Sequence, residues 1–153
     1  MTTPGIRIEG LDTLQKLFPT LQKQILSELK KGIAASAIMV QNEAKDSMRK
    51  AKHGKKYKRK SVEHVASAPG EPPALDTGRL IGSVNHNITE DGLTALIGIL
   101  DLSNVRYGKF LEYGTGRIAA RPWLFPALER QRANIEKRIQ LGIQKALSVN
   151  GGA

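Results

Sequence analysis

The sequence contains no cysteine among its 153 residues. Disulfides and thiolate metal sites are therefore excluded, so stability must come from packing within the chain or from association with other chains. Aromatic residues are few, at 5% of the chain, and most of them lie between positions 110 and 125. No stretch approaches the roughly 18 apolar residues of a membrane span. Residues 1–10 lack the pattern of a signal peptide, and we expect a cytoplasmic product without membrane contact.

The length and composition are those of one globular domain, with 40% hydrophobic and 25% charged residues. We treat residues 1–153 as a single domain, because no internal repeat is visible. The net charge is +10, but eight basic residues and no acidic one lie between Arg49 and Lys60. The rest of the chain holds sixteen of the 24 basic residues against all fourteen acidic ones. The basicity therefore belongs to one segment.

A long amphipathic helix is the strongest secondary-structure signal. Asp12 and Gln15 have capping-box spacing and predict a short helix that Pro19 stops or resets. From Thr20 onward, apolar residues recur every three or four positions, which predicts one helix of about thirty residues. This stripe consists of Leu21, Ile25, Leu29, Ile33, Ala37, Val40, Ala44 and Met48. We expect this stripe to pack against a partner surface, because its apolar side chains stabilise the chain only when they are removed from water.

The middle of the chain predicts a loop and then a hairpin. The segment from about 49 to 75 is basic, then rich in proline, and has no sustained period, so we expect a mobile loop. Residues 76–80 can begin a helical turn. Two apolar runs, 83–89 and 93–100, flank an Asp-Gly pair and predict an antiparallel hairpin. Helix and strand both stay open for residues 105–115.

A second amphipathic helix closes the chain. It begins at Pro122 or Pro126 and ends at Asn150. Its apolar face holds Leu128, Ile135, Ile139, Ile143 and Leu147. Together these elements predict an α+β fold, in which the long N-terminal helix and the C-terminal helix pack on a small antiparallel sheet.

The sequence offers no convincing catalytic, cofactor or metal site. None of the three histidines, His53, His64 and His86, has a second ligand at helical spacing. No serine lies in a nucleophile-elbow context. Residues 114–119 fit G-x-G-x-x-A, but Pro122 follows at once and no βαβ unit does, so turn glycines explain the match better. We expect no enzyme activity, no cofactor and no metal.

The basic segment supports three interpretations. Clustered lysines and arginines can neutralise phosphates and bind nucleic acid without sequence preference. They can also dock on an acidic neighbouring protein, or form a solvated loop. Tyr57 is the only aromatic residue there for base stacking. The candidate contact residues are Arg49, Lys50, Lys52, Lys55, Lys56, Lys58, Arg59 and Lys60.

Three ordered segments resemble one protein family. Residues 72–84 contain a Pro-Pro pair, Thr-Gly, a leucine and Ser-Val; residues 107–115 read Y-G-K-F-L-E-Y-G-T; residues 121–127 read R-P-W-L-F-P-A. In this order they resemble the tail-completion or neck family of long-tailed bacteriophages, typified by the tenth gene product of a lambdoid siphophage. The opening residues 8–11 are also similar. Two features depart from the pattern: Gly108 stands where alanine is common, and the basic stretch is longer than the motif needs.

The resemblance implies a structural virion protein that completes the tail or joins it to the neck, as one subunit of an oligomeric ring through which DNA passes. It also implies a hexamer and contacts with head-closure, tail-terminator or tail-tube proteins of the same phage. Non-specific contact with genomic DNA is one interpretation of the basic segment and stays open beside contact with an acidic protein. Such a protein would be assembled in the host cytoplasm and reside in the virion, at the neck or the top of the tail. The alternative is a small nucleic-acid-binding protein acting through residues 49–60.

The aromatic-rich segment predicts where subunits of such a ring meet. Aromatic side chains are enriched among interface anchors, although the same residues can instead fill the core between the sheet and the last helix. A ring needs contact between two different faces. We predict that residues 107–115 form one face and the long helix the other. The candidate interface residues are Tyr107, Phe110, Leu111, Glu112, Tyr113, Gly114, Thr115, Trp123 and Phe125.

Overall fold

The computed structural model describes residues 11–101 and 105–148, with side chains from Gln15 onward. Its elements are α1 (Leu11–Arg49), β1 (Lys56–Arg59), β2 (Val62–Val65), α2 (Arg79–Ser83), β3 (Val84–Ile88), β4 (Ala95–Ile99), α3 (Tyr107–Tyr113) and α4 (Phe125–Ser148). The predicted α+β class is confirmed. Within the described residues, no helix has the length and apolarity needed to cross a membrane.

Helix α1 is one continuous helix of 39 residues, about 58 Å long. The prediction that Pro19 stops or resets it is wrong, because Pro19 lies inside the helix. A proline removes one backbone donor, and the carbonyl that it frees needs another partner. All described side chains from Gln15 to Thr20 are exposed, so water can reach that carbonyl. The predicted cap at Asp12 involves a side chain outside the described ones.

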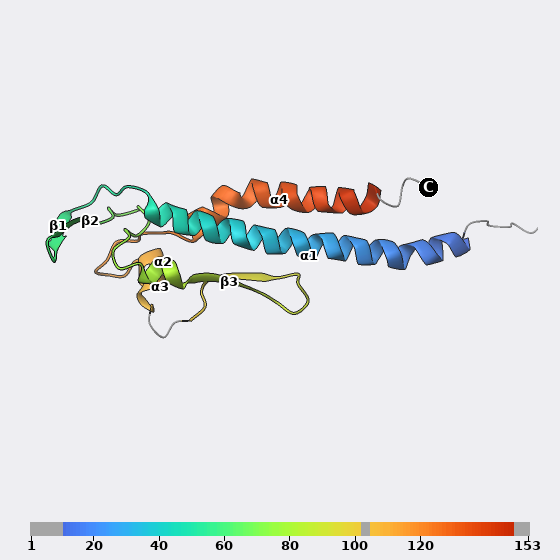
Figure 1. Ribbon diagram of the computed structural model, residues 1–153, viewed down its shortest axis with the longest axis horizontal. Helices are drawn as coiled ribbons and strands as arrows, with labels where there is room; N and C mark the ends of the chain where they lie inside the picture. The colour runs from blue at the N-terminus through green and yellow to red at the C-terminus, as the bar shows by residue number, and fades with distance from the viewer. Residues whose placement is uncertain (1–10, 102–104, 149–153) are drawn as a thin grey trace, which may run out of the picture.

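The apolar stripe of α1 is buried along its C-terminal half. Ala37, Val40, Ala44 and Met48 are almost fully buried. Helix α4 runs antiparallel along α1, which supplies the partner surface that the stripe requires (Figure 1). Helix α4 begins at Phe125, so Pro126 lies in its first turn; the predicted end at Asn150 lies outside the described residues.

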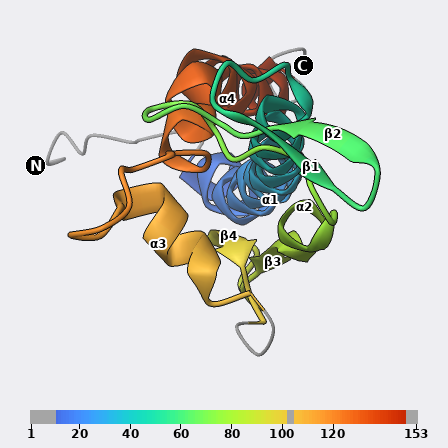
Figure 2. The same cartoon turned by 90° about the vertical axis from the view of Figure 1, so that its left-hand side faces the viewer.

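The β3–β4 hairpin packs on the side of α1 away from α4, so α1 is the middle of three layers (Figure 2). The predicted hairpin is confirmed: Val84 pairs with Ile99 and Ile88 with Ala95. The predicted helical turn is also present as α2, and residues 107–113, left open between helix and strand, form α3. A core of Met48, Leu80, Val84 and Trp123 joins these elements at one end of the molecule.

The prediction of a structureless loop from 49 to 75 is wrong for residues 56–65. These residues form a second hairpin, β1–β2, in which Tyr57 pairs with His64. Its two-residue turn consists of Lys60 and Ser61, both with positive φ, instead of the Asn-Gly or Asp-Gly pair that usually signals such a turn. Because three of the four β1 residues are charged and most residues of both strands are exposed, the segment lacks the alternating apolar pattern that predicts a strand.

Candidate assembly corner and basic hairpin

Glu112 is a buried carboxylate that caps the start of α4. Its side chain lies on α3 and is only 9% exposed. Glu112 Oε2 accepts hydrogen bonds from the backbone N–H groups of Trp123, at 2.7 Å, and Leu124, at 3.0 Å. Oε1 accepts one from Phe125 at 2.9 Å. The N-terminus of a helix has unpaired N–H groups and the positive end of the helix dipole. The Glu112 carboxylate accepts hydrogen bonds from these N–H groups and places negative charge next to the dipole.

Trp123 is buried in the core next to this cap. Its indole Nε1 donates to the carbonyl of Gly108 at 3.3 Å. The backbone N–H of Arg121 donates to the carbonyl of Leu111 at 2.6 Å. These bonds join the segment 107–115 to the segment 121–127. We call the region from Tyr107 to Phe125 the corner.

The Pro-rich segment reaches the same corner. The Gly70 N–H donates to the carbonyl of Ala120 at 2.9 Å. Arg121 Nε donates to the carbonyl of Ser67 at 3.2 Å. Segments from three parts of the sequence therefore converge around the entry into α4.

The glycines of residues 114–119 form a turn within the corner. Gly114 ends α3 with φ 74° and ψ 179°, a region that is essentially restricted to glycine. The Thr115 N–H donates to the carbonyl of Ile118 at 2.8 Å, which closes the turn. The start of α4, where a phosphate would bind in a dinucleotide fold, is occupied by the Glu112 carboxylate.

The nine predicted interface residues separate into buried, half-buried and exposed groups. Glu112 and Trp123 are buried within the chain, and Leu111 is half-buried against the core. Burial within one subunit does not fit the predicted contact of Glu112 and Trp123 with a neighbour; they shape the corner instead. Gly114 is half-buried and Thr115 exposed. The large exposed side chains are those of Tyr107, Phe110, Tyr113 and Phe125.

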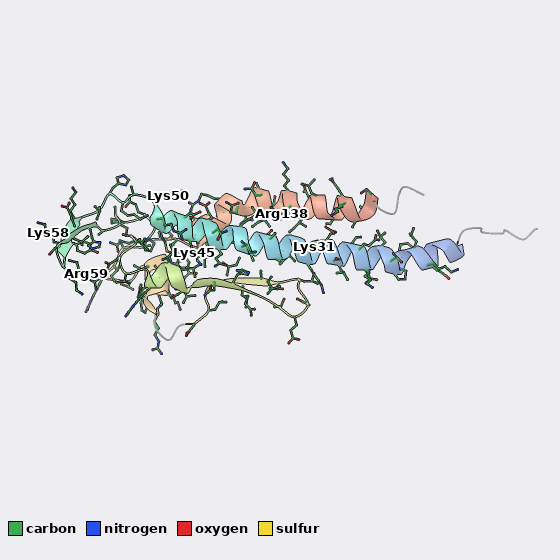
Figure 3. The ribbon with its side chains drawn as sticks, viewed as in Figure 1. Lys31, Lys45, Lys50, Lys58, Arg59 and Arg138 are labelled. Carbon is green, nitrogen blue, oxygen red and sulfur yellow. The ribbon has the colours of Figure 1, made fainter. Side chains whose placement is uncertain are left out.

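The eight basic candidates also separate into groups, around a hairpin that extends past the end of α1 (Figure 3). Three form ion pairs within the chain: Arg49 with Asp46, Lys56 with Glu63, and Arg59 with Asp76. Lys52 Nζ donates to the carbonyl of Ser47 at 2.8 Å, and partial burial lowers the pKa of Lys52. The others form no ion pair within the described part of the chain; they are Lys50, Lys55, Lys58 and Lys60.

Glu71 anchors the base of this hairpin, a role that the sequence did not reveal. Its Oε2 accepts hydrogen bonds from the backbone N–H groups of Ala68, at 2.8 Å, and His53, at 3.1 Å. His53 Nδ1 lies 2.6 Å from Glu71 Oε1. The Ala68 N–H above all, and then His53, lower the pKa of Glu71 to about 2. The sequence around Glu71 gives no sign of this role, because a single glutamate between a glycine and a proline resembles any solvated loop residue.

Replacing Glu71 with glutamine should remove an acid-dependent part of stability. Because the pKa of Glu71 falls from 4.5 to about 2 on folding, its carboxylate stabilises the fold fully above pH 4.5 and loses that effect as the pH falls towards 2. Unfolding followed by circular dichroism should show a wild-type advantage at pH 6 that shrinks steadily below pH 4.5. Glu136→Gln on the exposed face of α4 is the control. A Glu71→Gln difference that stays constant from pH 6 to 2 would contradict this role.

Each of the three histidines contacts a different side chain. His53 contacts Glu71, His64 stacks on Tyr57 with ring centroids 5.5 Å apart, and His86 hydrogen-bonds Gln41. Among the described residues, no group of three or more acidic or histidine side chains is arranged to hold a metal ion. Comparison with protein-family models, with curated proteins and with solved structures gives no match for this chain.

Proposed function

We propose that this chain is a structural virion protein of the head-to-tail connector of a long-tailed phage, and that it works as one subunit of an oligomeric ring around the DNA. The observation that carries the proposal is the Glu112 cap. It links the E-Y-G-T segment to the R-P-W-L-F-P-A segment through three backbone hydrogen bonds. The segments on which the family resemblance rests thus build one corner, with the Pro-rich segment bonded to it.

Exposed apolar surface supports association with further copies. Four large side chains on the corner are exposed, namely Tyr107, Phe110, Tyr113 and Phe125. Helix α1 continues past the end of α4 (Figure 1), and Phe18, in the N-terminal part of α1, is 64% exposed. Tyr107, Phe110 and Tyr113 lie three residues apart on α3, so their side chains are neighbours along that helix, and clustered apolar surface of this kind is typical of association sites.

The two surfaces can form the unlike faces of a ring contact. The corner lies at one end of the molecule, near the C-terminal end of α1 (Figure 1), whereas Phe18 belongs to the N-terminal part of that helix. A contact between two different faces repeats from copy to copy, and it closes into a ring when the rotation permits. A helix extension without tertiary partners is only marginally stable in water, so packing against a neighbouring copy would stabilise it.

Phe110→Asp should disrupt the oligomer. Phe110 is 51% exposed on α3, so an aspartate there is tolerated by the folded chain but places an unpaired charge inside a packed contact. We expect the assembled species to be lost at concentrations where the wild type forms rings, as measured by native mass spectrometry and light scattering. Electron microscopy of the wild type should show rings with a central hole.

Leu96→Asp is the matched control, because Leu96 is 54% exposed on β4, outside the corner. It should leave assembly unchanged. An oligomer that tolerates Phe110→Asp would show that the corner is not a ring face. A strict monomer that binds DNA, with affinity falling by orders of magnitude between about 50 and 200 mM salt, would instead support a nucleic-acid-binding protein acting through residues 49–60.

A further inference from the structure

A groove of about 450 Å³ runs between α1 and α4, on a part of the surface that the basic hairpin does not reach. Four cationic side chains line it: Lys31 from α1, and Lys137, Arg138 and Lys145 from α4. Figure 3 shows Lys31 and Arg138 at neighbouring positions along the two helices. The apolar lining includes Met39 and Leu141, and Leu141 is 54% exposed.

The groove has an excess of positive charge. Its single carboxylate belongs to Glu28, whose Oε1 lies 2.8 Å from Lys31 Nζ and 3.9 Å from Lys145 Nζ. Lys137 and Arg138 form no ion pair with any described residue. A fitting occupant therefore carries carboxylates for the cations and an apolar side chain for Leu141. A bare phosphate would supply negative charge for the cations but no apolar group for Leu141.

The tip of the β3–β4 hairpin has this chemistry. Glu90 and Asp91 are both exposed there, and Leu93 beside them is 41% exposed. The tip is also rigid, since Asp91 Oδ1 accepts a hydrogen bond from the Leu93 N–H at 2.8 Å, and the Thr89 hydroxyl donates to the Thr94 carbonyl at 3.0 Å. A preorganised tip loses little conformational entropy on docking.

The tip and the groove lie at the same height along α1 but on opposite sides of it. Gly92 in the tip lies against the side chain of Lys30, because a Cβ on Gly92 would come within 2.9 Å of it. The groove is lined by Lys31 and Gly32. Lys30 and Gly32 point about 200° apart on a helix. A tip therefore cannot enter its own groove, but it can reach the groove of a copy placed alongside.

We infer that the Glu90–Leu93 tip of one copy docks into the α1–α4 groove of the next copy, with its carboxylates on Lys137 and Arg138 and Leu93 against Leu141. The inference rests on the proposed ring function and adds a second contact to the corner. The tip and the groove are different surfaces of one copy, so this contact repeats from copy to copy and closes into a ring when the rotation permits.

Charge reversal tests this pairing. Arg138→Glu and Glu90→Arg should each raise the concentration needed for half-assembly by about tenfold or more, because each places like charges together across the contact. The double variant should recover most of the wild-type assembly, as measured by sedimentation. Arg79→Glu, an exposed residue of α2, is the control. Circular dichroism should show that each variant is folded.

Engineered cysteines give a second readout, since the chain has none of its own. Leu93→Cys combined with Leu141→Cys should produce covalent oligomers on mild oxidation, whereas Leu96→Cys combined with Leu141→Cys should not. Oligomers that show neither rescue by the double reversal nor this cross-link would overturn the inference and leave the ring proposal standing. A chain that stays monomeric at every concentration, without cross-links, would overturn both.

Discussion

Replacing Glu112 with glutamine is expected to lower the free energy of unfolding by about 2–4 kcal/mol. The buried carboxylate accepts three backbone hydrogen bonds at the start of α4, and hydrogen bonds to charged groups contribute about 1.5–3 kcal/mol each before context reduces their sum. Glutamine keeps one acceptor oxygen but turns an NH2 group towards backbone donors and removes the charge that faces the helix dipole. Thermal unfolding should show a midpoint lower by about 5–15 °C.

Glu136→Gln provides the comparison for this prediction. Both residues are glutamates, but the Glu136 side chain is exposed on α4, so its replacement should change stability by less than about 0.5 kcal/mol. Equal effects of the two substitutions would mean that the Glu112 carboxylate does not cap α4. A further readout is assembly: if the cap positions Phe125, the folded fraction of Glu112→Gln should also assemble less readily than the wild type.

Gly114→Ala should destabilise the chain by a similar amount, about 2–4 kcal/mol. The backbone of Gly114 has φ 74° and ψ 179°, where a side chain introduces strain of about 1–3 kcal/mol. A Cβ there would also lie 2.9 Å from both the Ala120 nitrogen and the Ile118 oxygen. These are backbone atoms of the turn itself, so neither can move aside as the end of a flexible side chain could. Urea unfolding at neutral pH measures the loss.

Gly116→Ala is the control for this substitution, two residues further along the same turn. Gly116 has no positive φ, and no atom lies within 4 Å of the place where its Cβ would be. Alanine should therefore be neutral there, or stabilise by about 0.4–1 kcal/mol through the lower entropy of the unfolded chain. If Gly114→Ala were as mild as Gly116→Ala, the turn would not require glycine at residue 114.

The helices and the β3–β4 hairpin could be predicted because their signals are local and periodic. The stripe of α1 repeats at helical spacing over eight apolar residues, and the Asp-Gly pair at 91–92 separates two apolar runs. The β1–β2 hairpin could not be predicted in the same way. Its strands are mostly exposed and have no alternating apolar pattern, and its Lys60-Ser61 turn has no residue that specifically favours positive φ.

The site residues divide along the same line. Sequence composition located the aromatic cluster and the basic segment, since both are runs of neighbouring residues. It could not distinguish Trp123, which is buried, from Phe125, which is exposed, because the two aromatic residues are only two positions apart. The difference depends on the direction in which α4 leaves the corner, and Glu112 sets that direction from another helix.

The sequence alone therefore determined the α+β class, the two long helices, the β3–β4 hairpin and the absence of cysteine chemistry, because each depends on residue type or short-range spacing. Only the tertiary structure decided which aromatic residues face solvent, which lysines have partners, and that a basic groove and an acidic tip lie at one height on opposite sides of α1. Those properties depend on contacts between residues such as Glu28 and Lys145, or Gly92 and Lys30. No local pattern brings such distant residues together; the packing of α1 against α4 and the hairpin does.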